Sequence, residues 1–364
     1  MATIFRMGSN METDLYTITD VFRNIISDQA TLKSALEKLD EAALKVLLVV
    51  AQDKFVATLT DGDVRRAILA GASLDTSITQ IANYNPLYLR YDDEDMARQY
   101  LELVTALPLV DDEKKIQKLY IKKIEEQPVE TEKITFPVVI MAGGLGTRLY
   151  PYTKILPKPL IPVRDIPIAE RIIQSFQRLG CEQIHMIVNY KKNMIKAYFS
   201  DSNYNITFWD ETETLGTGGG LYLLKETVKD TFILTNCDVL IMSNVKEIVK
   251  HHKQVKNKAT MVCSIKNFVI PYGIVHFSEG GEIESFEEKP QMSFFTNTGY
   301  YILEKEAFQY IGQNERIGMP DIIERMKNAG EKVGIFPIGE NSWLDMGQFD
   351  TMESMERKLS ELNL

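Results

Sequence analysis

A continuous apolar run at residues 136–141 passes directly into a glycine-rich segment at residues 142–149. An apolar run without polar alternation is typical of a strand that is buried on both faces of a parallel sheet. A glycine-rich loop between a strand and a helix lets backbone N–H groups approach a phosphate, because glycine has no side chain in the way. This join therefore predicts an α/β fold with a strand, a phosphate-binding loop and a helix.

The loop differs from the two common phosphate loops. A dinucleotide-binding GxGxxG pattern would need glycine where the chain has Leu149, and the Gly-Lys-Ser/Thr of a Walker A motif is absent. The segment that follows carries several prolines around Lys158, and these stiffen the backbone there. Arg148 offers a planar fork of donors to a triphosphate, and Lys158 offers a compact charge.

The stretch 143–163, GGLGTRLYPYTKILPKPLIPV, closely resembles the signature of sugar-1-phosphate nucleotidyltransferases. The resemblance implies a Rossmann-like mixed-sheet domain and an enzyme of EC 2.7.7 type, with Arg148 and Lys158 as catalytic residues. The segment 215–219 resembles a second family loop that opens a helix against the base and sugar, with Gly218 in place of the usual alanine. The NTP-binding residues implied are Ala142, Gly143, Gly144, Gly146, Thr147, Gly216, Thr217 and Gly218.

A metal site is predicted at the end of a second apolar strand, residues 232–236, which leads to Asp238. A carboxylate in this position faces the crevice where α/β sheets bind ligands. The resemblance implies that Asp238 and Asp345 hold Mg²⁺, a cation that prefers oxygen ligands. A turn or a helix cap is the alternative role for Asp345. Cys237 has no histidine or lysine near it in sequence, so we interpret it as a packed thiol.

Three further segments, at 271–275, 286–290 and 297–300, match the order of the family's sugar-side elements. The first has a glycine that allows close approach, the second resembles a Glu-Lys-Pro element, and the third an Asn-Thr-Gly element. The resemblance implies that Glu288 accepts hydrogen bonds from sugar hydroxyls and that Lys289 binds the sugar phosphate. The sugar-phosphate residues implied are Gly273, Glu288, Lys289, Asn297 and Thr298.

The first 124 residues contain an internal repeat. A helix, a strand, a turn and a second strand are expected at 32–60 and again at 95–121, an offset of about 60 residues. Each copy alone would expose one face of a short sheet, so the copies should pack together. The order resembles a tandem CBS module of βαββα type, with copies at about 14–72 and 73–124. The resemblance implies stacking against a second module, and hence a homodimer or a larger homo-oligomer.

The segment 57–63 resembles the nucleotide motif of CBS domains, with Ala57 in place of glycine. The resemblance implies that Thr60 and Asp63 bind the phosphate side and the ribose of an adenosine nucleotide. A helix cap formed by the Thr60–Asp61 pair is the alternative. The matching stretch of the second copy, 118–124, has neither threonine nor aspartate, so that site is expected to be degenerate.

Residues 125–135 are polar and charged with one proline, as in an interdomain linker before a transferase domain at 136–364. The formal charge of −10 disfavours a nucleic-acid surface. Three widely spaced cysteines favour a reducing cytoplasm over a disulfide framework. The N-terminus lacks the apolar region of a signal peptide, and no run approaches the roughly 20 apolar residues of a membrane span.

The implied reaction forms an NDP-sugar and pyrophosphate from an NTP and a sugar 1-phosphate. A CBS pair in front of such a domain resembles the guanylyltransferases of bacterial legionaminic acid pathways, which favours GTP and glucosamine 1-phosphate. Mannose 1-phosphate with GTP, and uridylyl, thymidylyl or cytidylyl transfer, stay open as alternatives. A non-catalytic nucleotide-sensing regulator is a rival of another class, and it predicts loss of Lys158, Asp238 or Asp345, all of which are present. A protein that serves only to dimerise is a further alternative, but it would not need the glycine-rich loop.

Overall fold

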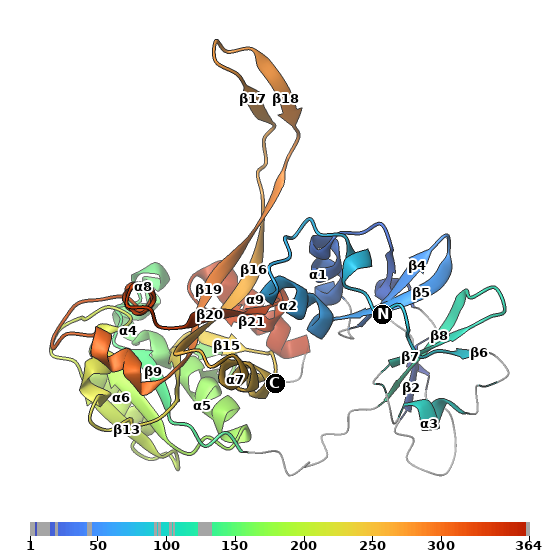
Figure 1. Cartoon of the computed structure of the whole chain (residues 1–364). Helices are drawn as coiled ribbons and strands as arrows, with labels where there is room; N and C mark the ends of the chain where they lie inside the picture. The colour runs from blue at the N-terminus through green and yellow to red at the C-terminus, as the bar shows by residue number, and fades with distance from the viewer. Residues whose placement is uncertain are drawn as a thin grey trace. The chain divides into compact units, whose positions relative to one another are not determined.

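The computed structural model describes residues 4–5, 15–18, 21–41, 46–90, 93, 96–101, 104, 106–122 and 133–361. The chain divides into two compact units, Met1–Thr131 and Glu132–Leu364. Most of the predicted linker lies outside the described residues. Figure 1 shows the elements of each unit along the colour bar.

The first unit contains the predicted repeat. In each copy a short strand runs parallel to a second strand, which turns back as an antiparallel third strand, and a helix follows the short strand. The register shifts at the same place in both hairpins, between Val49 and Val50 and between Leu109 and Val110. The elements of the first copy are β3 (Ile25–Ser27), α1 (Leu32–Glu41), β4 (Val46–Ala51), β5 (Lys54–Thr60) and α2 (Asp61–Leu69). Those of the second are β6 (Leu89–Arg90), α3 (Ala97–Tyr100), β7 (Ala106–Val110) and β8 (Ile116–Lys122).

The two copies pack together through a shared apolar cluster, as the repeat predicts. Leu48 and Phe55 of the first copy meet Val110 and Leu119 of the second in this cluster. The Phe55 backbone N–H also donates to the carbonyl of Lys114, at 2.8 Å. Two further strands, β1 (Ile4–Phe5) and β2 (Leu15–Ile18), extend the sheet of the second copy. The helix expected at 95–103 is described only as α3, because several of its residues lie outside the described ones.

The second unit is built on a seven-stranded mixed sheet in the order β13-β12-β9-β14-β19-β16-β20. The first four of these strands are parallel, and β19 runs antiparallel to both of its neighbours. The mixed sheet predicted for the transferase domain is therefore confirmed. Its strands are β9 (Val138–Ala142), β12 (Ile184–Val188), β13 (Ile206–Asp210), β14 (Phe232–Asn236), β16 (Ala259–Val269), β19 (Gln291–Leu303) and β20 (Val333–Ile338).

Helices cover both faces of this sheet, so the central strand β9 is buried on both sides. Val138 and Ile140 belong to one apolar cluster, and Val139 and Met141 belong to the other. The first cluster includes residues of α5 (Ile168–Arg178), α6 (Lys192–Phe199), α7 (Val245–Val255) and α9 (Phe349–Glu361). The second includes residues of α8 (Met319–Asn328) and of two 3-10 segments, Gly219–Leu224 and Lys305–Tyr310.

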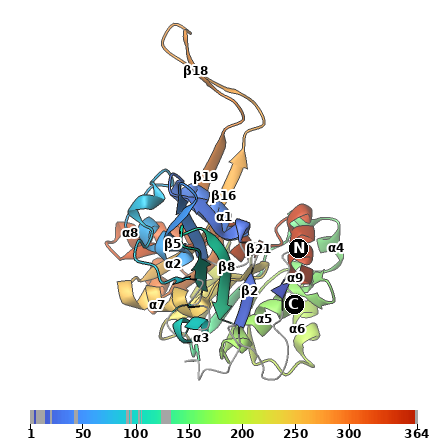
Figure 2. The same cartoon turned by 90° about the vertical axis from the view of Figure 1, so that its right-hand side faces the viewer.

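A long ribbon leaves the sheet, and we call residues 265–295 the arm. Strand β20 pairs with β16 only as far as Ser264, and β14 pairs with β19 only from Tyr300 to Leu303. Beyond these residues β16 and β19 form a two-stranded ribbon that continues into the hairpin of β17 (Ile274–Phe277) and β18 (Ile283–Glu287). Figures 1 and 2 both show this ribbon reaching away from its own sheet.

Short elements complete the second unit. The segment after the glycine-rich loop contains α4 (Tyr152–Ile155), β10 (Pro162–Val163) and β11 (Ile166–Pro167). Two strands that are distant in sequence, β15 (Val239–Ile241) and β21 (Trp343–Asp345), form a small antiparallel pair. Among the described residues, no helix is both long and apolar enough to cross a membrane.

Candidate active site

The glycine-rich loop leaves the carboxyl end of β9 as predicted. Gly146 has a φ of 64°, in the left-handed region that favours glycine. The hydroxyl of the buried Thr153 holds this turn by donating to the Gly146 carbonyl, at 2.9 Å. The expectation of a helix directly after the loop is wrong, because Thr147–Leu149 form a single 3-10 turn. The proline at 151 follows at once, and a proline inside a helix would remove a backbone donor and clash with the preceding turn.

Lys158 lies in the next 3-10 turn, Lys158–Leu160, and forms an ion pair with Asp238. Both side chains are largely buried, with 13% and 11% of their areas exposed. Burial alone would lower the pKa of Lys158, but the charge of Asp238 and the hydrogen bond to it outweigh burial. The pKa of Lys158 is therefore raised, and the ammonium stays charged.

The fold brings Asp238 and Asp345 together, as the metal prediction requires. Val239 of β15 is the register partner of Asp345 in β21, and the backbone N–H of Met346 donates to the Asp238 carbonyl, at 2.9 Å. The pKa of Asp345 is raised, first by burial and then by the negative charge of Asp238. The charges of Lys158 and Arg148 oppose this rise, so Asp238, Lys158 and Arg148 are all close enough to affect the pKa of Asp345.

Two carboxylates beside one lysine fit the chemistry of a magnesium site. Mg²⁺ is commonly bound by one or two carboxylates and keeps waters and substrate phosphates in the rest of its shell. The described part of the chain has no cluster of three or more His, Cys, Asp or Glu side chains that could hold a metal ion. The repulsion that raises the pKa of Asp345 is one that a divalent cation would relieve.

Arg148 is exposed beside the same edge. It lines a hollow together with Gln348, Phe349 and Asp350, which follow the Asp345 segment. Cys237 is buried, and burial with the adjacent charge of Asp238 raises its pKa to about 12. The thiol is therefore not a nucleophile, in agreement with its interpretation as a packed side chain.

The second loop, residues 215–218, is held against the start of α8. Gly216 has a φ of 81°, and a Cβ there would lie 2.6 Å from the Ile317 carbonyl oxygen. Gly218 donates its backbone N–H to the same carbonyl, at 3.0 Å, and the Thr217 hydroxyl accepts from the Met319 N–H, at 3.1 Å. The segment that follows, Gly219–Leu224, is the helix implied, and it is of the 3-10 type.

The five sugar-side residues divide into two groups. Asn297 and Thr298 lie at the base of the arm, next to Gly299, where a Cβ would lie 2.2 Å from Asn236 Nδ2. Asn236 ends β14, two positions before Asp238, so this pair is close to the carboxylates. The Asn297 amide donates to the Tyr301 hydroxyl at 2.6 Å, and the Thr298 hydroxyl donates to the Val262 carbonyl at 2.8 Å.

Gly273, Glu288 and Lys289 form the other group, and they lie far along the arm. A Cβ at Gly273 would lie 2.9 Å from Glu288 Oε2, so these two positions face each other across the ribbon. Strand β19 begins at Gln291, six positions before Asn297, which is about 20 Å of strand at the usual rise of about 3.3 Å per residue, and Lys289 lies two positions before the strand begins. The structure therefore does not bring Glu288 and Lys289 to the Lys158–Asp238 pair.

The residue that sequence reasoning missed is Glu211. It directly follows β13 and is 3% exposed. Its carboxylate lies between the two loops, because a Cβ at Gly143 would be 2.3 Å from Oε2 and one at Gly220 would be 2.4 Å from Oε1. The signal that identified Asp238, an acidic residue at the carboxyl end of a strand, also applies to Glu211.

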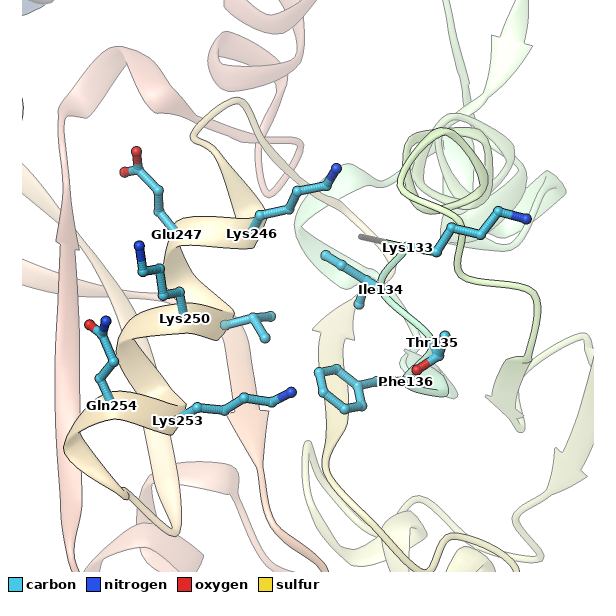
Figure 3. A pocket seen from close by; sticks show the side chains of 10 residues that line it. Lys133, Ile134, Thr135, Phe136, Lys246, Glu247, Lys250, Lys253 and Gln254 are labelled. Atoms are coloured by element: carbon cyan, nitrogen blue, oxygen red, sulfur yellow. The ribbon is translucent and has the colours of Figure 1, made fainter. Parts of the chain in front are cut away.

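A second hollow contains none of the predicted site residues. Its lining residues, shown in Figure 3, come from the chain before β9 and from α7. The Lys253 ammonium lies over the Phe136 ring, 4.5 Å from its centroid. This hollow is at the amino end of β9, so the strand separates it from the glycine-rich loop at the carboxyl end.

In the first unit, Thr60 caps the start of α2, which was the alternative to a nucleotide site, but its capping partner is Asp63 rather than Asp61. The Thr60 backbone N–H donates to Asp63 Oδ2 at 2.9 Å, and the Asp63 N–H donates to Thr60 Oγ1 at 3.2 Å. Asp63 also pairs with Arg66. Together these contacts form a capping box at the start of α2. Nucleotide binding by Thr60 and Asp63 stays a prediction.

Comparison with known proteins agrees with this geometry. The family described as nucleotidyl transferase matches residues 137–361. The chain belongs to this family. The match covers the mixed sheet, both loops and both carboxylates, so the family predicted for the second unit is confirmed.

Curated members of the family resemble the chain at about 30% identity. A UTP–glucose-1-phosphate uridylyltransferase of Synechocystis is 30% identical over 234 residues, which cover 58% of this chain and 60% of the relative. A mannose-1-phosphate guanyltransferase of Saccharomyces cerevisiae is 32% identical over 225 residues, covering 58% and 61%. A bifunctional GlmU protein of Methanocaldococcus jannaschii is 30% identical over 232 residues, covering 62% and 55%. The matches thus span little more than half the length of these relatives.

Among solved structures, HddC from Yersinia pseudotuberculosis superposes with a TM-score of 0.50 at 23% identity. The match covers 62% of this chain and 100% of HddC. At this identity the likeness speaks for the fold alone. It agrees with the α/β mixed sheet of the second unit.

Proposed function

We propose that the chain is a Mg²⁺-dependent sugar-1-phosphate nucleotidyltransferase, with GTP and glucosamine 1-phosphate as the favoured pair. The observation that carries the proposal is the Lys158–Asp238 ion pair beside Asp345 and the glycine-rich loop. These groups gather opposite charges at the carboxyl edge of the sheet, where α/β proteins bind nucleotides. The named relatives act on sugar 1-phosphates with UTP or transfer a guanylyl group.

The reaction is an in-line displacement at phosphorus. An oxygen of the sugar 1-phosphate attacks the α-phosphorus of the NTP, the bond from that phosphorus to the bridging oxygen breaks, and pyrophosphate leaves with the electron pair. The nucleophile is already an anion, so no general base is needed. The protein contributes positioning and charge neutralisation.

Different residues of this chain are assigned to positioning and to charge neutralisation. The backbone of Gly143 and Gly144 approaches the nucleotide, and Arg148 with Lys158 holds its phosphates. The charged state of Lys158 follows from its raised pKa. Asp238 and Asp345 hold the magnesium ion, which when bound neutralises phosphate charge and orients the phosphates.

The sugar side is assigned to Gly273, Glu288, Lys289, Asn297 and Thr298. Because three of these lie far along the arm, the assignment requires the arm to bend toward its own site or to reach the site of a second copy. The apolar side chains of the arm favour such a covered state. The exposed ones include Phe268, Tyr272, Phe277, Phe286 and Phe294.

The first unit is proposed to be a tandem CBS module that dimerises and senses an adenosine nucleotide. The paired β-α-β-β topology of its two copies supports this proposal. A cytoplasmic enzyme of nucleotide-sugar biosynthesis, regulated by nucleotide level, would suit such a module. The oligomer would form through this module.

A pyrophosphate-release screen tests the function. Purified full-length chain with Mg²⁺ is given each of GTP, UTP, CTP, dTTP and ATP with glucosamine, mannose, glucose and N-acetylglucosamine 1-phosphates. One active pair that is lost in Asp238→Ala supports the proposal and the metal assignment together. If no combination of NTP and sugar 1-phosphate releases pyrophosphate while the first unit still binds a nucleotide, the result favours the non-catalytic sensor.

A further inference from the structure

The short helix α4 lies on the path from the glycine-rich loop to Lys158. Its Thr153 hydroxyl donates to the Gly146 carbonyl at 2.9 Å, and Lys158 lies three positions after the last residue of the helix. A Cβ at Gly146 would lie 2.8 Å from Thr153 Cγ2 and 3.2 Å from Lys158 Cβ, so the loop, the helix and the lysine pack against one another. A shift of α4 would therefore displace both the loop and Lys158.

The sequence leaves carbonyls at the end of α4 without helical donors. In a longer helix the carbonyls of Thr153 and Ile155 would accept from the N–H groups four positions further on. Those positions are Pro157 and Pro159, which have no N–H. Carbonyls at a helix end need donors from outside the helix, so α4 depends on a neighbouring segment to complete its last turn.

Two adjacent side chains from the turn between β12 and α6 supply these donors. The Tyr190 hydroxyl donates to the Thr153 carbonyl at 3.1 Å. The Lys191 ammonium donates to the carbonyls of Lys154 and Ile155, at 2.6 and 2.7 Å. A cation suits this place, because the carboxyl end of a helix carries partial negative charge. The contact connects α4 to the end of a buried strand of the sheet.

The backbone of Lys191 has a conformation that lysine seldom adopts. Its φ of 51° and ψ of 33° lie in the left-handed region, where glycine would be less strained. A residue other than glycine persists in such a region when the surrounding structure holds it there. The two bonds from the ammonium to the end of α4 are contacts that glycine could not make, and they account for a lysine at this position.

We propose that Lys191 is a positioning residue of the transferase, which holds α4 and thereby fixes Lys158 and the glycine-rich loop against the triphosphate. This inference rests on the proposed function. Lys191 acts through α4 and not on the substrate, because its ammonium is engaged by two backbone carbonyls. Its loss should therefore affect the rate of the chemical step more than the binding of the NTP.

Lys191→Met removes the ammonium and keeps an apolar stem of similar length. With the active substrate pair, kcat should fall by about 10- to 100-fold, the effect of a misplacement of about 1 Å, while the dissociation constant of the NTP changes by less than about threefold. Lys191→Arg keeps a charged donor and should recover most of kcat. Lys191→Gly relieves the left-handed backbone, so it should keep a melting temperature near that of the wild type and still lose kcat.

Hydrogen exchange tests the same contact without turnover. The backbone amides of residues 147–158 should exchange about tenfold faster or more in Lys191→Met than in the wild type, because α4 opens more often when its end is not held. Lys192→Met is the matched control, since Lys192 is the next residue and its ammonium pairs with Asp210 at 3.2 Å. It should keep the exchange and the kcat of the wild type.

Unchanged exchange in Lys191→Met, or a loss of kcat no larger than in Lys192→Met, would overturn the inference. A loss of NTP affinity in proportion to kcat would also overturn it, because Lys191 would then be a direct ligand of the phosphates. If the wild type releases no pyrophosphate with any substrate pair while exchange still rises in Lys191→Met, the proposed function fails and the support of α4 by Lys191 stands.

Discussion

Lys158 and Asp238, 80 positions apart, form an ion pair at the carboxyl edge of the mixed sheet. Asp238 reaches this point because β14 ends beside the glycine-rich loop, and Lys158 because the proline-rich segment folds back under that loop. In this pair the Lys158 ammonium contacts the Asp238 carboxylate, which we propose to be a metal ligand. Each partner can therefore be tested separately.

Lys158→Met should lower kcat by about 10²- to 10³-fold, the usual cost of removing one group that stabilises transition-state charge. It should also destabilise the protein by about 3 kcal/mol, because Asp238 loses its cation next to Asp345. Mg²⁺ should then raise the melting temperature of Lys158→Met by more than that of the wild type. Steady-state kinetics and thermal denaturation measure these effects.

Lys154→Met is the control, since Lys154 is exposed and lies four positions earlier. It should leave both kcat and the magnesium response unchanged. If Mg²⁺ stabilises neither the wild type nor Lys158→Met, the assignment of the metal to Asp238 and Asp345 is wrong.

The sugar-side assignment predicts a different pattern. Glu288→Gln and Lys289→Ala should each raise the KM for the sugar phosphate by about tenfold or more, while the dissociation constant of GTP stays constant. The reason is that the two side chains would contact only the sugar phosphate, through hydroxyl hydrogen bonds and phosphate charge. Glu284→Gln, on the exposed arm tip, is the matched control.

The same assignment requires the arm to move. Hydrogen exchange of residues 268–290 should slow when sugar phosphate binds with GTP, because their backbone would become covered. Unchanged exchange together with an unchanged KM in both variants would remove Glu288 and Lys289 from the site.

The sequence predicted those parts of the site that depend on local pattern. The buried run before the glycine-rich loop and the acidic residue after the strand at 232–236 are local signals, and β9 and the position of Asp238 agree with them, whereas Asp345 was implied only by the family resemblance. The arm was not predictable in this way. Its direction depends on the register of β16 with β19 over residues far apart in sequence. Motif order alone cannot tell how far Lys289 lies from Asn297.

The segments after the two loops form short 3-10 turns and helices rather than longer helices, for local reasons that the motif does not show. Proline at 151 leaves room only for a 3-10 turn after the first loop, and three glycines in a row, 218–220, weaken helix propensity after the second. Glu211 was missed because no motif includes it. Its place directly after β13 was the one local signal, and the structure adds the two glycines that make room for its carboxylate.

The first unit gives a prediction that separates the capping role from ligand binding. Thr60→Ala should cost about 1 kcal/mol of stability through loss of the cap at α2. If the unit also binds an adenosine nucleotide through Thr60, ATP or AMP should raise the melting temperature of the wild type and not that of the variant. Thr58→Ala, a neighbour in β5, is the control for nucleotide binding. An adenosine nucleotide that changes neither melting temperature nor activity counts against the sensor role.

Glu211 predicts a pH dependence of stability whose sign follows from its pKa. The folded protein holds the proton up to about pH 7, whereas an unfolded glutamate releases it near 4.5. The folded state therefore binds more protons in this range, and its stability falls as pH rises from about 4.5 to 7. The shift corresponds to about 3 kcal/mol at most, since one pKa unit is about 1.4 kcal/mol.

Glu211→Gln cannot ionise, so it should lose this part of the pH dependence. The variant should be more stable than the wild type at pH 8 by up to about 3 kcal/mol, and the two should converge near pH 5. Denaturant unfolding at a series of pH values measures the gap, with Glu213→Gln expected to follow the wild type. A constant gap at every pH would mean that the Glu211 carboxylate is stabilised in the folded protein by some other contact.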